Sequence, residues 1–371
     1  MSLNVNWLKH FHLFTLASTT RSVSFLFALI LLSGVVACSS NDDEPIYRNQ
    51  ILAFGTIVEV TLFDIDETEG DRLSKDIREM MEEFHHHWHA WQPGPLTALN
   101  NALSQTGYSK ISAEDGQLIA QSLTLAKTSE GLFNPILGKL IALWGFQGEE
   151  TPLSPPSKQN IEEAMTLIPS IDKFTINSDD KGTHLSVASG KPIHFDLGGF
   201  AKGVIVDRSI EYLRRQGVNN AIINAGGDLR AIGSAGERPW RIGIRHPRDL
   251  GVFASITINK DESIFTSGDY ERYFEYEGKR YHHIIDPRNG YPADSVASVT
   301  VLHHDSATAD AAATALFIAG TQQWQRIAKS MGVEHVMLID KENKVYLTPE
   351  LAQRMEYEVS PPPVVEIREL P

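Results

Sequence analysis

The sequence predicts an α+β fold, a single domain of mostly antiparallel sheets with packed helices. Apolar and polar residues alternate in the second half, at Trp240, Ile242 and Ile244 and again over residues 252–258, as in half-buried antiparallel strands. Helical spacing appears over residues 71–91 and 114–130. The chain has no G-x-x-x-x-G-K-[ST], G-x-G-x-x-G or G-x-S-x-G motif. These absences argue against a P-loop enzyme and a Rossmann dehydrogenase.

The elements follow in order along the chain. A strand is expected over residues 54–62, followed by the 71–91 helix with Leu73, Ile77 and Phe84 on one side. Short strands are expected over residues 171–195. Further strands are predicted at Ala221–Asn224 and Val299–Leu302, and a helix capped by Asp305 or Ser306 should run through Ala319.

The net charge of the chain limits the classes of molecule that it can bind. The 371 residues carry a net charge of −14, and residues 1–37 contribute only Lys9 and Arg21 as charged groups, which leaves −16 for the rest. An acidic surface disfavours nucleic acid as a partner. A polyanionic ligand would need local neutralisation by a metal ion or a few basic side chains.

The N-terminal region has the layout of an export signal. Lys9 and Arg21 precede an apolar run over residues 23–36, which meets Cys38, the single cysteine of the chain. We expect a lipoprotein signal peptide over 1–37, lipidated Cys38, a tether over 38–50, a folded domain over 51–357 and a proline-rich tail over 358–371. The alternative is a plain signal peptide or membrane anchor with an incidental cysteine. The lipoprotein would face the periplasm, from the inner or the outer membrane, and Ser39 after the cysteine favours the outer one.

The stretch from Asp196 to Gly203 is the one around which the chain is organised. A short strand at 192–195 is expected to lead into a carboxylate, two glycines and Lys202 in the first turn of a helix. Glycines let the backbone approach a ligand closely, and helix-start N–H groups with a lysine favour anionic oxygens. The pattern suggests a nucleotide diphosphate held with a metal ion. An ordinary strand–turn–helix corner is the alternative.

Two other clusters have both a functional and a structural interpretation. Asp310 and Thr314 share a helix face at i, i+4, where both can point at one hard cation, or they can be a helix-start aspartate and a buried threonine. The run from His85 to His89 can bind a transition metal, but we prefer a solvated helix end because further ligands are not evident.

Five motifs follow one another along the chain. They are Asp196-Leu-Gly-Gly-Phe-Ala-Lys-Gly203, Asn224-Ala-Gly-Gly-Asp228, Thr266-Ser-Gly268, His283-Ile-Ile-Asp-Pro-Arg288, and Ala309-Asp310 through Thr314. Their order resembles the ApbE family of FAD:protein FMN transferases, over roughly residues 51–345. The resemblance implies an ApbE-like domain that binds FAD with Mg²⁺ near the pyrophosphate. A threonine or serine hydroxyl of a partner protein attacks the FMN phosphorus, and AMP leaves. Phosphoryl-type transfer relies on positioning and charge neutralisation, which agrees with the residues themselves.

The resemblance also implies roles for single residues. His283 would be the base that takes the hydroxyl proton, because a histidine pKa near neutrality suits that task; strand alternation would turn His282 away from the site. Metal ligands would be Asp310, Thr314 and the Gly199 carbonyl. Contacts to FAD would come from Phe54, Trp91, Leu132, Phe133, Asn134, Asp196, Lys202 and Ile285. The chain departs from the family pattern at Phe54, Asn134 and Asn289, and Ala90-Trp91 makes Trp91 a less secure contact.

The implied partners are extracytoplasmic acceptor flavoproteins such as subunits of membrane redox pumps. Two alternatives stay open. The same site with water as acceptor would be a Mg²⁺-dependent FAD pyrophosphatase giving FMN and AMP. A flavin-binding lipoprotein without enzymatic activity is the other.

Overall fold

A nine-stranded sheet forms the centre of the computed structural model, which describes residues 46–148, 152–258 and 261–371. Neighbouring strands are antiparallel except the last pair, β15 and β17, which is parallel. In spatial order the strands are β1 (Ile46–Ala53), β2 (Thr56–Phe63), β6 (Ala221–Ala225), β7 (Asp228–Ile232), β10 (Asp261–Gly268), β13 (Val296–His303), β14 (His335–Asp340), β15 (Val345–Leu347) and β17 (Val365–Ile367).

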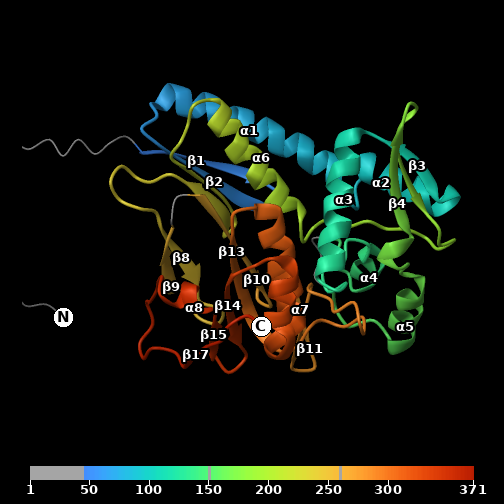
Figure 1. Ribbon diagram of the computed structural model, residues 1–371. Helices are drawn as coiled ribbons and strands as arrows, with labels where there is room; N and C mark the ends of the chain where they lie inside the picture. Colours follow the sequence, from blue (N-terminus) through green and yellow to red (C-terminus); the bar gives the residue numbers. More distant parts are fainter. Residues whose placement is uncertain (1–45, 149–151, 259–260) are drawn as a thin grey trace, which may run out of the picture. The chain divides into compact units, whose positions relative to one another are not determined.

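Helices cover one face of this sheet. Figure 1 shows α1 (Glu67–Trp88), α6 (Ala201–Arg215) and α7 (Ser306–Met331) running beside β1, β6 and β13. Apolar side chains of these helices and strands form the largest core, in which Trp324 and Phe317 are fully buried. Helix α7 is kinked at Gly320, whose φ of 65° lies in the left-handed region that favours glycine.

The opposite face of the sheet packs on a smaller one. Strands β8 (Arg241–Arg245), β9 (Val252–Thr257) and β16 (Met355–Tyr357) pair in the order β16-β9-β8, and a second apolar core containing Trp240 and Phe253 joins them to the large sheet. Short helix α8 (Pro349–Ala352) connects β15 to β16.

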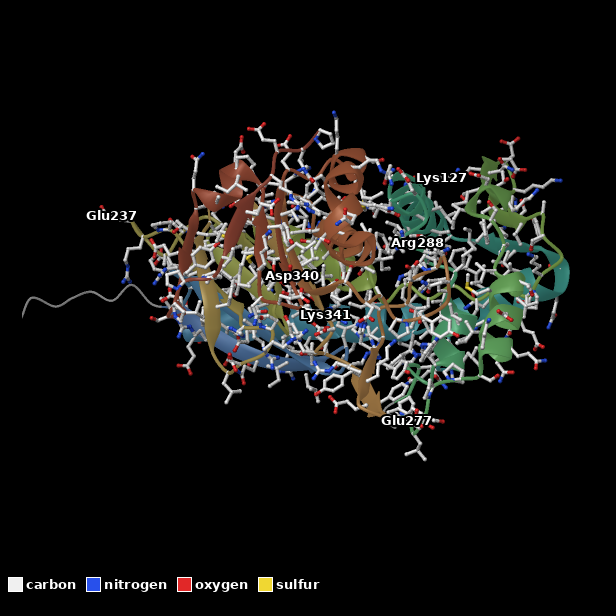
Figure 2. The ribbon with its side chains drawn as sticks, turned by 90° about the horizontal axis from the view of Figure 1, so that it is seen from below. Lys127, Glu237, Glu277, Arg288, Asp340 and Lys341 are labelled. Carbon is white, nitrogen blue, oxygen red and sulfur yellow. The ribbon has the colours of Figure 1, made fainter. Side chains whose placement is uncertain are left out.

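A helical region with its own small sheet follows α1 in the chain. It contains α2 (Pro95–Thr106), α3 (Ala113–Thr128), α4 (Gly138–Leu143), α5 (Lys158–Leu167) and the 3₁₀ turn Ile171–Lys173, with β3 (Tyr108–Ile111), β4 (Phe174–Asp179) and β5 (Gly182–Val187) in the order β3-β5-β4. A two-stranded hairpin, β11 (Tyr273–Tyr276) and β12 (Lys279–His282), stands apart from the other sheets, and Figure 2 shows Glu277 at its outer end.

The predicted α+β class is confirmed, with the described residues in one compact unit. The predicted strand at 192–195 is wrong. This segment has no regular secondary structure and pairs with no strand, because side chains of α2 occupy its backbone groups. Asn100 bonds the N–H and C=O of Phe195 at 2.7 and 3.0 Å, and Ser104 does the same for Ile193 at 2.8 and 3.0 Å.

Both predicted ends of the folded domain also need correction. Residues 46–50, assigned to the tether, are the first part of β1, since Tyr47 is buried against Gly70 of α1. Within the predicted tail, β17 extends the large sheet, and Arg368 donates to the carbonyl of Thr321 at 2.8 Å. The predicted signal peptide, Cys38 and the rest of the tether lie outside the described residues. Within the described residues no helix is long and apolar enough to cross a membrane.

Candidate active site

Helices α6 and α7 touch at a point where only glycine fits. A Cβ atom on Gly203 would lie 2.3 Å from the carbonyl oxygen of Ser306. This close approach lets the Gly203 N–H donate to Oδ2 of Asp310 at 3.0 Å. We call Lys202, Gly203, Ser306 and Asp310 the α6–α7 junction. The last glycine of the organising stretch therefore serves helix packing and carboxylate orientation together.

The carboxyl group of Asp310 is buried without enough positive charge around it. Its residue is 6% exposed, and burial raises the Asp310 pKa to about 7, with Lys202 opposing the rise and Asp228 adding to it. Lys202 forms an ion pair with Asp228. Although burial alone lowers the Lys202 pKa, the carboxylates of Asp228 and Asp310 raise it above its ordinary value. A cation placed beside Asp310 would relieve this imbalance.

Oxygen atoms gather on the same face of α7. The hydroxyl of Thr314 lies 3.3 Å from the hydroxyl of Ser267, and the position of a Cβ on Gly199 lies 3.3 Å from Thr314 Oγ1. The described residues contain no group of three or more His, Cys, Asp or Glu side chains suited to a metal. A carboxylate, hydroxyls and a backbone carbonyl are instead the donors that a hard cation such as Mg²⁺ prefers. The residues present thus fit the implied ion.

His283 follows the end of β12 and has one ring nitrogen committed. Its Nδ1 lies 3.3 Å from the carbonyl oxygen of Arg272, which can only accept, so Nδ1 carries the proton and Nε2 keeps its lone pair. Burial, aided by the charge of Arg272, lowers the His283 pKa to about 3. The ring is therefore neutral at pH 7 with Nε2 able to accept a proton, though the pKa is lower than the near-neutral value we expected.

His282 has a structural environment. It is 3% exposed, its Nε2 donates to the carbonyl of Ala293 at 2.7 Å, and its ring lies edge-on to Phe317. Burial lowers its pKa to about 4. Both nitrogens are used, because Nδ1 accepts the N–H of Ile284. His283 lies just beyond the end of β12, and the prediction that its side chain enters the site while that of His282 does not stays a prediction.

The rest of the His283 motif makes packing contacts and ion pairs within the protein. The Ile285 side chain is 4% exposed within an apolar cluster that includes Trp144 and Phe274, so its packing gives no support to a predicted cofactor contact. Arg288 pairs with Asp286 through two nitrogens at 2.7 and 2.9 Å and also donates to the carbonyl of Ile318 in α7 at 3.1 Å.

A row of aromatic and imidazole rings, which we call the ring wall, consists of Phe54, His85, His89, Trp91 and His194. Phe54 sits at the β1–β2 turn with a φ of 54°, and its ring meets His85 edge-to-face at 5.0 Å. His85 meets His89 in the same way, with ring centroids 5.0 Å apart, and Trp91 stacks on His194 with ring centroids 4.3 Å apart. These rings are half-buried, so the helix end at 85–89, expected to be solvated, is only partly solvated at His85 and His89.

The remaining predicted contacts lie on two neighbouring loops. Leu132 and Phe133 are 4% and 3% exposed, and the Phe133 ring reaches the space next to Gly199. Asp196 receives the N–H of Gly198 at 2.8 Å and donates its own N–H to the carbonyl of Pro135 at 2.8 Å. This bond joins the loop after α3 to the organising stretch.

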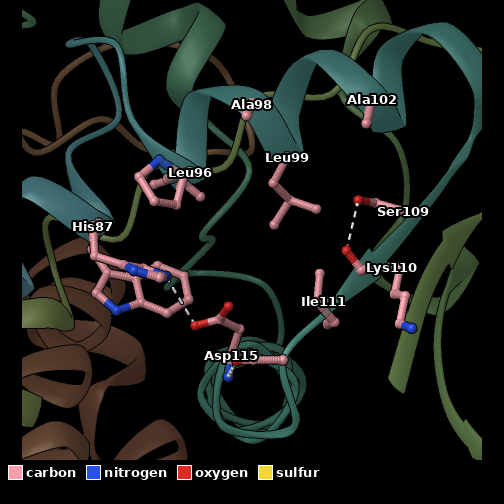
Figure 3. Close-up of a pocket in the computed structure, with 12 residues that line it drawn as sticks. His87, Leu96, Ala98, Leu99, Ala102, Ser109, Lys110, Ile111 and Asp115 are labelled. Carbon is pink, nitrogen blue, oxygen red and sulfur yellow. Dashed lines mark hydrogen bonds and ion pairs between the residues drawn. The ribbon is translucent and has the colours of Figure 1, made fainter. Parts of the chain in front are cut away.

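Two cavities of the molecule are lined mostly by residues outside the predicted site. The side chain of Asn134 lines a cavity of about 520 Å³ between α3 and the turn at 169–172. Another of about 590 Å³ lies between α2, β3 and α3, where His87 pairs with Asp115 at 3.0 Å (Figure 3). None of the predicted site residues lines this second cavity.

The structure brings Gly199 beside Thr314 and Lys202 near Asp310, four of the residues to which the resemblance assigns contacts with Mg²⁺ or FAD. Sequence reasoning missed the roles of Ser267, Asp228, His89 and His194. The glycine pair before Asp228 was a usable signal, since the same feature marked Asp196–Lys202. No pattern in the sequence pointed to His89 or His194, apart from the number of histidines in the chain.

Comparison with known proteins shows which family and which relatives the chain is similar to. The model of the ApbE family matches residues 54–337. A FAD:protein FMN transferase of Rhodobacter capsulatus is 35% identical over 345 residues, covering 92% of this chain and 65% of the relative, so the chain spans about two thirds of that protein. One from Haemophilus influenzae is 31% identical, over 83% of this chain and 88% of the relative.

Solved structures agree in fold. The ApbE protein of Thermotoga maritima matches with a TM-score of 0.75 and 31% identity, covering 84% of this chain and 99% of that one. The flavin transferase ApbE of Vibrio cholerae matches with a TM-score of 0.71 and 27% identity, over 84% of this chain and all of its own length.

Proposed function

The chain belongs to the ApbE family, and on that premise we propose that it transfers FMN from FAD to a hydroxyl group of a target protein and releases AMP. The observation that carries the proposal is the α6–α7 junction, where the buried carboxyl of Asp310 accepts the Gly203 N–H and interacts with the charge of Lys202. One turn further along α7, the Thr314 hydroxyl lies beside Gly199. A strand–turn–helix corner without a ligand has no need of a carboxyl group buried in this way.

The oxygen donors of Asp310, Thr314 and Gly199 would hold Mg²⁺. When bound, the ion would neutralise charge on the pyrophosphate as the phosphorus is attacked. Lys202 supplies a second positive charge from the first turn of α6, with Asp228 orienting its ammonium group. The chain thereby offers a site for the most highly charged part of FAD.

His283 takes the proton in this scheme. The hydroxyl oxygen of the acceptor forms a bond to the FMN phosphorus, the bond from that phosphorus to the AMP oxygen breaks, and the hydroxyl proton moves to Nε2 of His283. The bond between Nδ1 and the Arg272 carbonyl fixes the ring in the required tautomer. Negative charge on a pyrophosphate bound close to the ring would raise the His283 pKa from its low value and make the ring a better base.

We infer the cellular setting from the N-terminal sequence. The apolar run and Cys38 support a lipid-anchored protein that faces the periplasm. Its acceptors would then be extracytoplasmic flavoproteins such as redox-pump subunits. Labelling with a radioactive fatty acid, in wild type and in Cys38→Ser, tests the anchor directly.

The activity is tested with protein beginning at Ser39, FAD, Mg²⁺ and an acceptor domain, with a chelator control. An acceptor heavier by one FMN, together with released AMP, is expected only when Mg²⁺ is present. AMP and free FMN beside unmodified acceptors would favour the pyrophosphatase. Bound FAD with neither product would favour a flavin-binding lipoprotein.

A further inference from the structure

His89 ends helix α1 and holds the turn that follows. The residue has an extended conformation, with φ −71° and ψ 118°. Its Nδ1 accepts the backbone N–H groups of Trp91 at 3.1 Å and Gln92 at 3.0 Å. An asparagine or aspartate side chain makes the same pair of bonds in an Asx turn. The imidazole thus positions the backbone of Trp91.

These two bonds determine which ring nitrogen carries the proton. Because Nδ1 is an acceptor, the neutral imidazole must have its hydrogen on Nε2. Burial lowers the His89 pKa, with Asp196 opposing, so the ring is neutral at pH 7. Within the described parts of the chain the Nε2–H group makes no hydrogen bond, and the side chain is half-exposed. His89 therefore presents a fixed, unused donor.

The same bonds argue against a metal site at this place. His85 and His89 have the i, i+4 spacing of a metal-binding pair, and their rings lie 5.0 Å apart. A neutral imidazole binds a metal through a nitrogen that lacks a proton. The only such nitrogen of His89 faces two N–H groups, so Nε2 could bind a metal only after losing its proton.

The donor lies within the ring wall. The His89 ring contacts His85, whose ring contacts Phe54. Its Nδ1 also holds the backbone of Trp91, whose ring stacks on His194. Asp196, before α6, is the carboxylate that acts on His89 electrostatically. Phe54, Trp91 and Asp196 are among the residues that the resemblance expects to contact FAD outside the α6–α7 junction.

We propose that the Nε2–H of His89 donates a hydrogen bond to the isoalloxazine ring of FAD, which makes His89 a flavin-binding residue of this chain. The inference rests on the proposed function. The polar edge of oxidised isoalloxazine consists mainly of acceptors, namely two carbonyl oxygens and the unprotonated N1 and N5. A donor that cannot change its tautomer distinguishes this edge from apolar rings of similar size.

The test separates the donor from the turn. In His89→Asn, Oδ1 can still accept from the N–H groups of Trp91 and Gln92, but no donor remains at the Nε2 position. His86→Asn, at an exposed neighbour in α1, is the matched control. Binding of FAD and of ADP, which lacks the flavin, is measured by calorimetry with protein beginning at Ser39, and the visible spectrum of bound FAD is recorded.

Loss of one neutral hydrogen bond should raise the Kd for FAD about 3- to 10-fold in His89→Asn. The Kd for ADP should stay unchanged, and the flavin absorption band should shift. His86→Asn should match wild type. In His89→Gln the amide nitrogen can replace Nε2, so the wild-type spectrum should return; this variant also serves if His89→Asn does not fold.

Three results would overturn the role of His89. They are an unchanged Kd for FAD in His89→Asn, an equal loss for FAD and ADP, and a spectrum that neither variant alters. Wild-type protein that binds FAD but never releases AMP would contradict the proposed function while leaving the comparison of affinities valid. Wild-type protein that does not bind FAD overturns both.

Discussion

The α6–α7 junction and the ring wall are built in different ways. At the junction the backbones of two helices touch through Gly203. The buried carboxyl of Asp310 accepts the Gly203 N–H, and the half-buried Lys202 pairs with Asp228. Within the ring wall, half-exposed rings form edge-to-face and stacked pairs whose centroids lie 4.3–5.0 Å apart. One region is fixed by sterics and charge, the other by aromatic contact.

The difference teaches where the site should tolerate change. Charges interact strongly in a buried, poorly solvated place, and the loss of one partner leaves the other uncompensated. Aromatic contacts contribute about 0.5–1.5 kcal/mol each and can be replaced in part by other apolar groups. We therefore expect large losses of activity from the junction and graded losses of affinity from the ring wall.

The largest effect is expected from Asp310→Ala, which removes the carboxylate proposed to hold Mg²⁺. AMP release from FAD should fall at least ~10³-fold, because several kcal/mol of charge stabilisation are lost. Chromatographic measurement of AMP, with Gln322→Ala at an exposed position of α7 as control, provides the check. Full turnover by Asp310→Ala would refute the assignment of the junction as the cation site.

His283→Ala should keep FAD binding and slow transfer by roughly 10²–10⁴-fold, because only the proton acceptor is lost. Single-turnover transfer and FAD titration measure the two quantities separately. His282→Ala is the neighbouring comparison and should mainly reduce stability, since it removes the bond to Ala293. An unchanged rate in His283→Ala would eliminate it as the base.

A pH series should reveal a smaller effect at His282. Its pKa is about 4 in the folded protein against an ordinary value of 6.5, so below pH 6.5 the unfolded chain binds the extra proton. Stability is therefore lost as pH falls from 6.5 to 4, by up to about 3 kcal/mol from this group. Urea unfolding of His282→Asn should show a flatter pH dependence than wild type, whereas His86→Asn should not.

The smallest effect is expected in the ring wall. Trp91→Leu removes the stack on His194 and should raise the Kd for FAD only about 3- to 10-fold, with the Mg²⁺ requirement intact. Trp91→Phe should raise the Kd for FAD by a smaller factor than Trp91→Leu. A loss as large as that of Asp310→Ala would contradict the contrast drawn between the two regions.

Short spacings along the chain predict part of the geometry of the α6–α7 junction. Asp310 and Thr314 share a face because they are one helical turn apart, and Lys202 follows a glycine turn, so both geometries are set by nearby residues. The partners that complete the site, Ser267 and Asp228, arrive through pairing within the large sheet. The spacing of residues along the chain does not predict contacts that form through strand pairing.

The wrong predictions have a similar cause. An extended segment at 192–195 looks like a strand in sequence, and only the Asn100 and Ser104 side chains of α2 reveal why it pairs with none. The short alternation from Val365 to Ile367 was hidden by three prolines before it, although it completes the large sheet. Ring contacts such as Trp91 with His194 join residues 103 positions apart in the chain.

The contact between Arg288 and the carbonyl of Ile318 has a consequence for insertions and deletions. Through it the segment after His283 is attached to α7, just before the kink at Gly320, and Asp310 lies on the same helix. A change of chain length between His283 and Arg288 would alter the separation of the proton acceptor from Asp310. A residue added at Gly332, beyond the end of α7, would leave that separation intact. Length variation among natural relatives should therefore be found after α7 and avoided between residues 283 and 288.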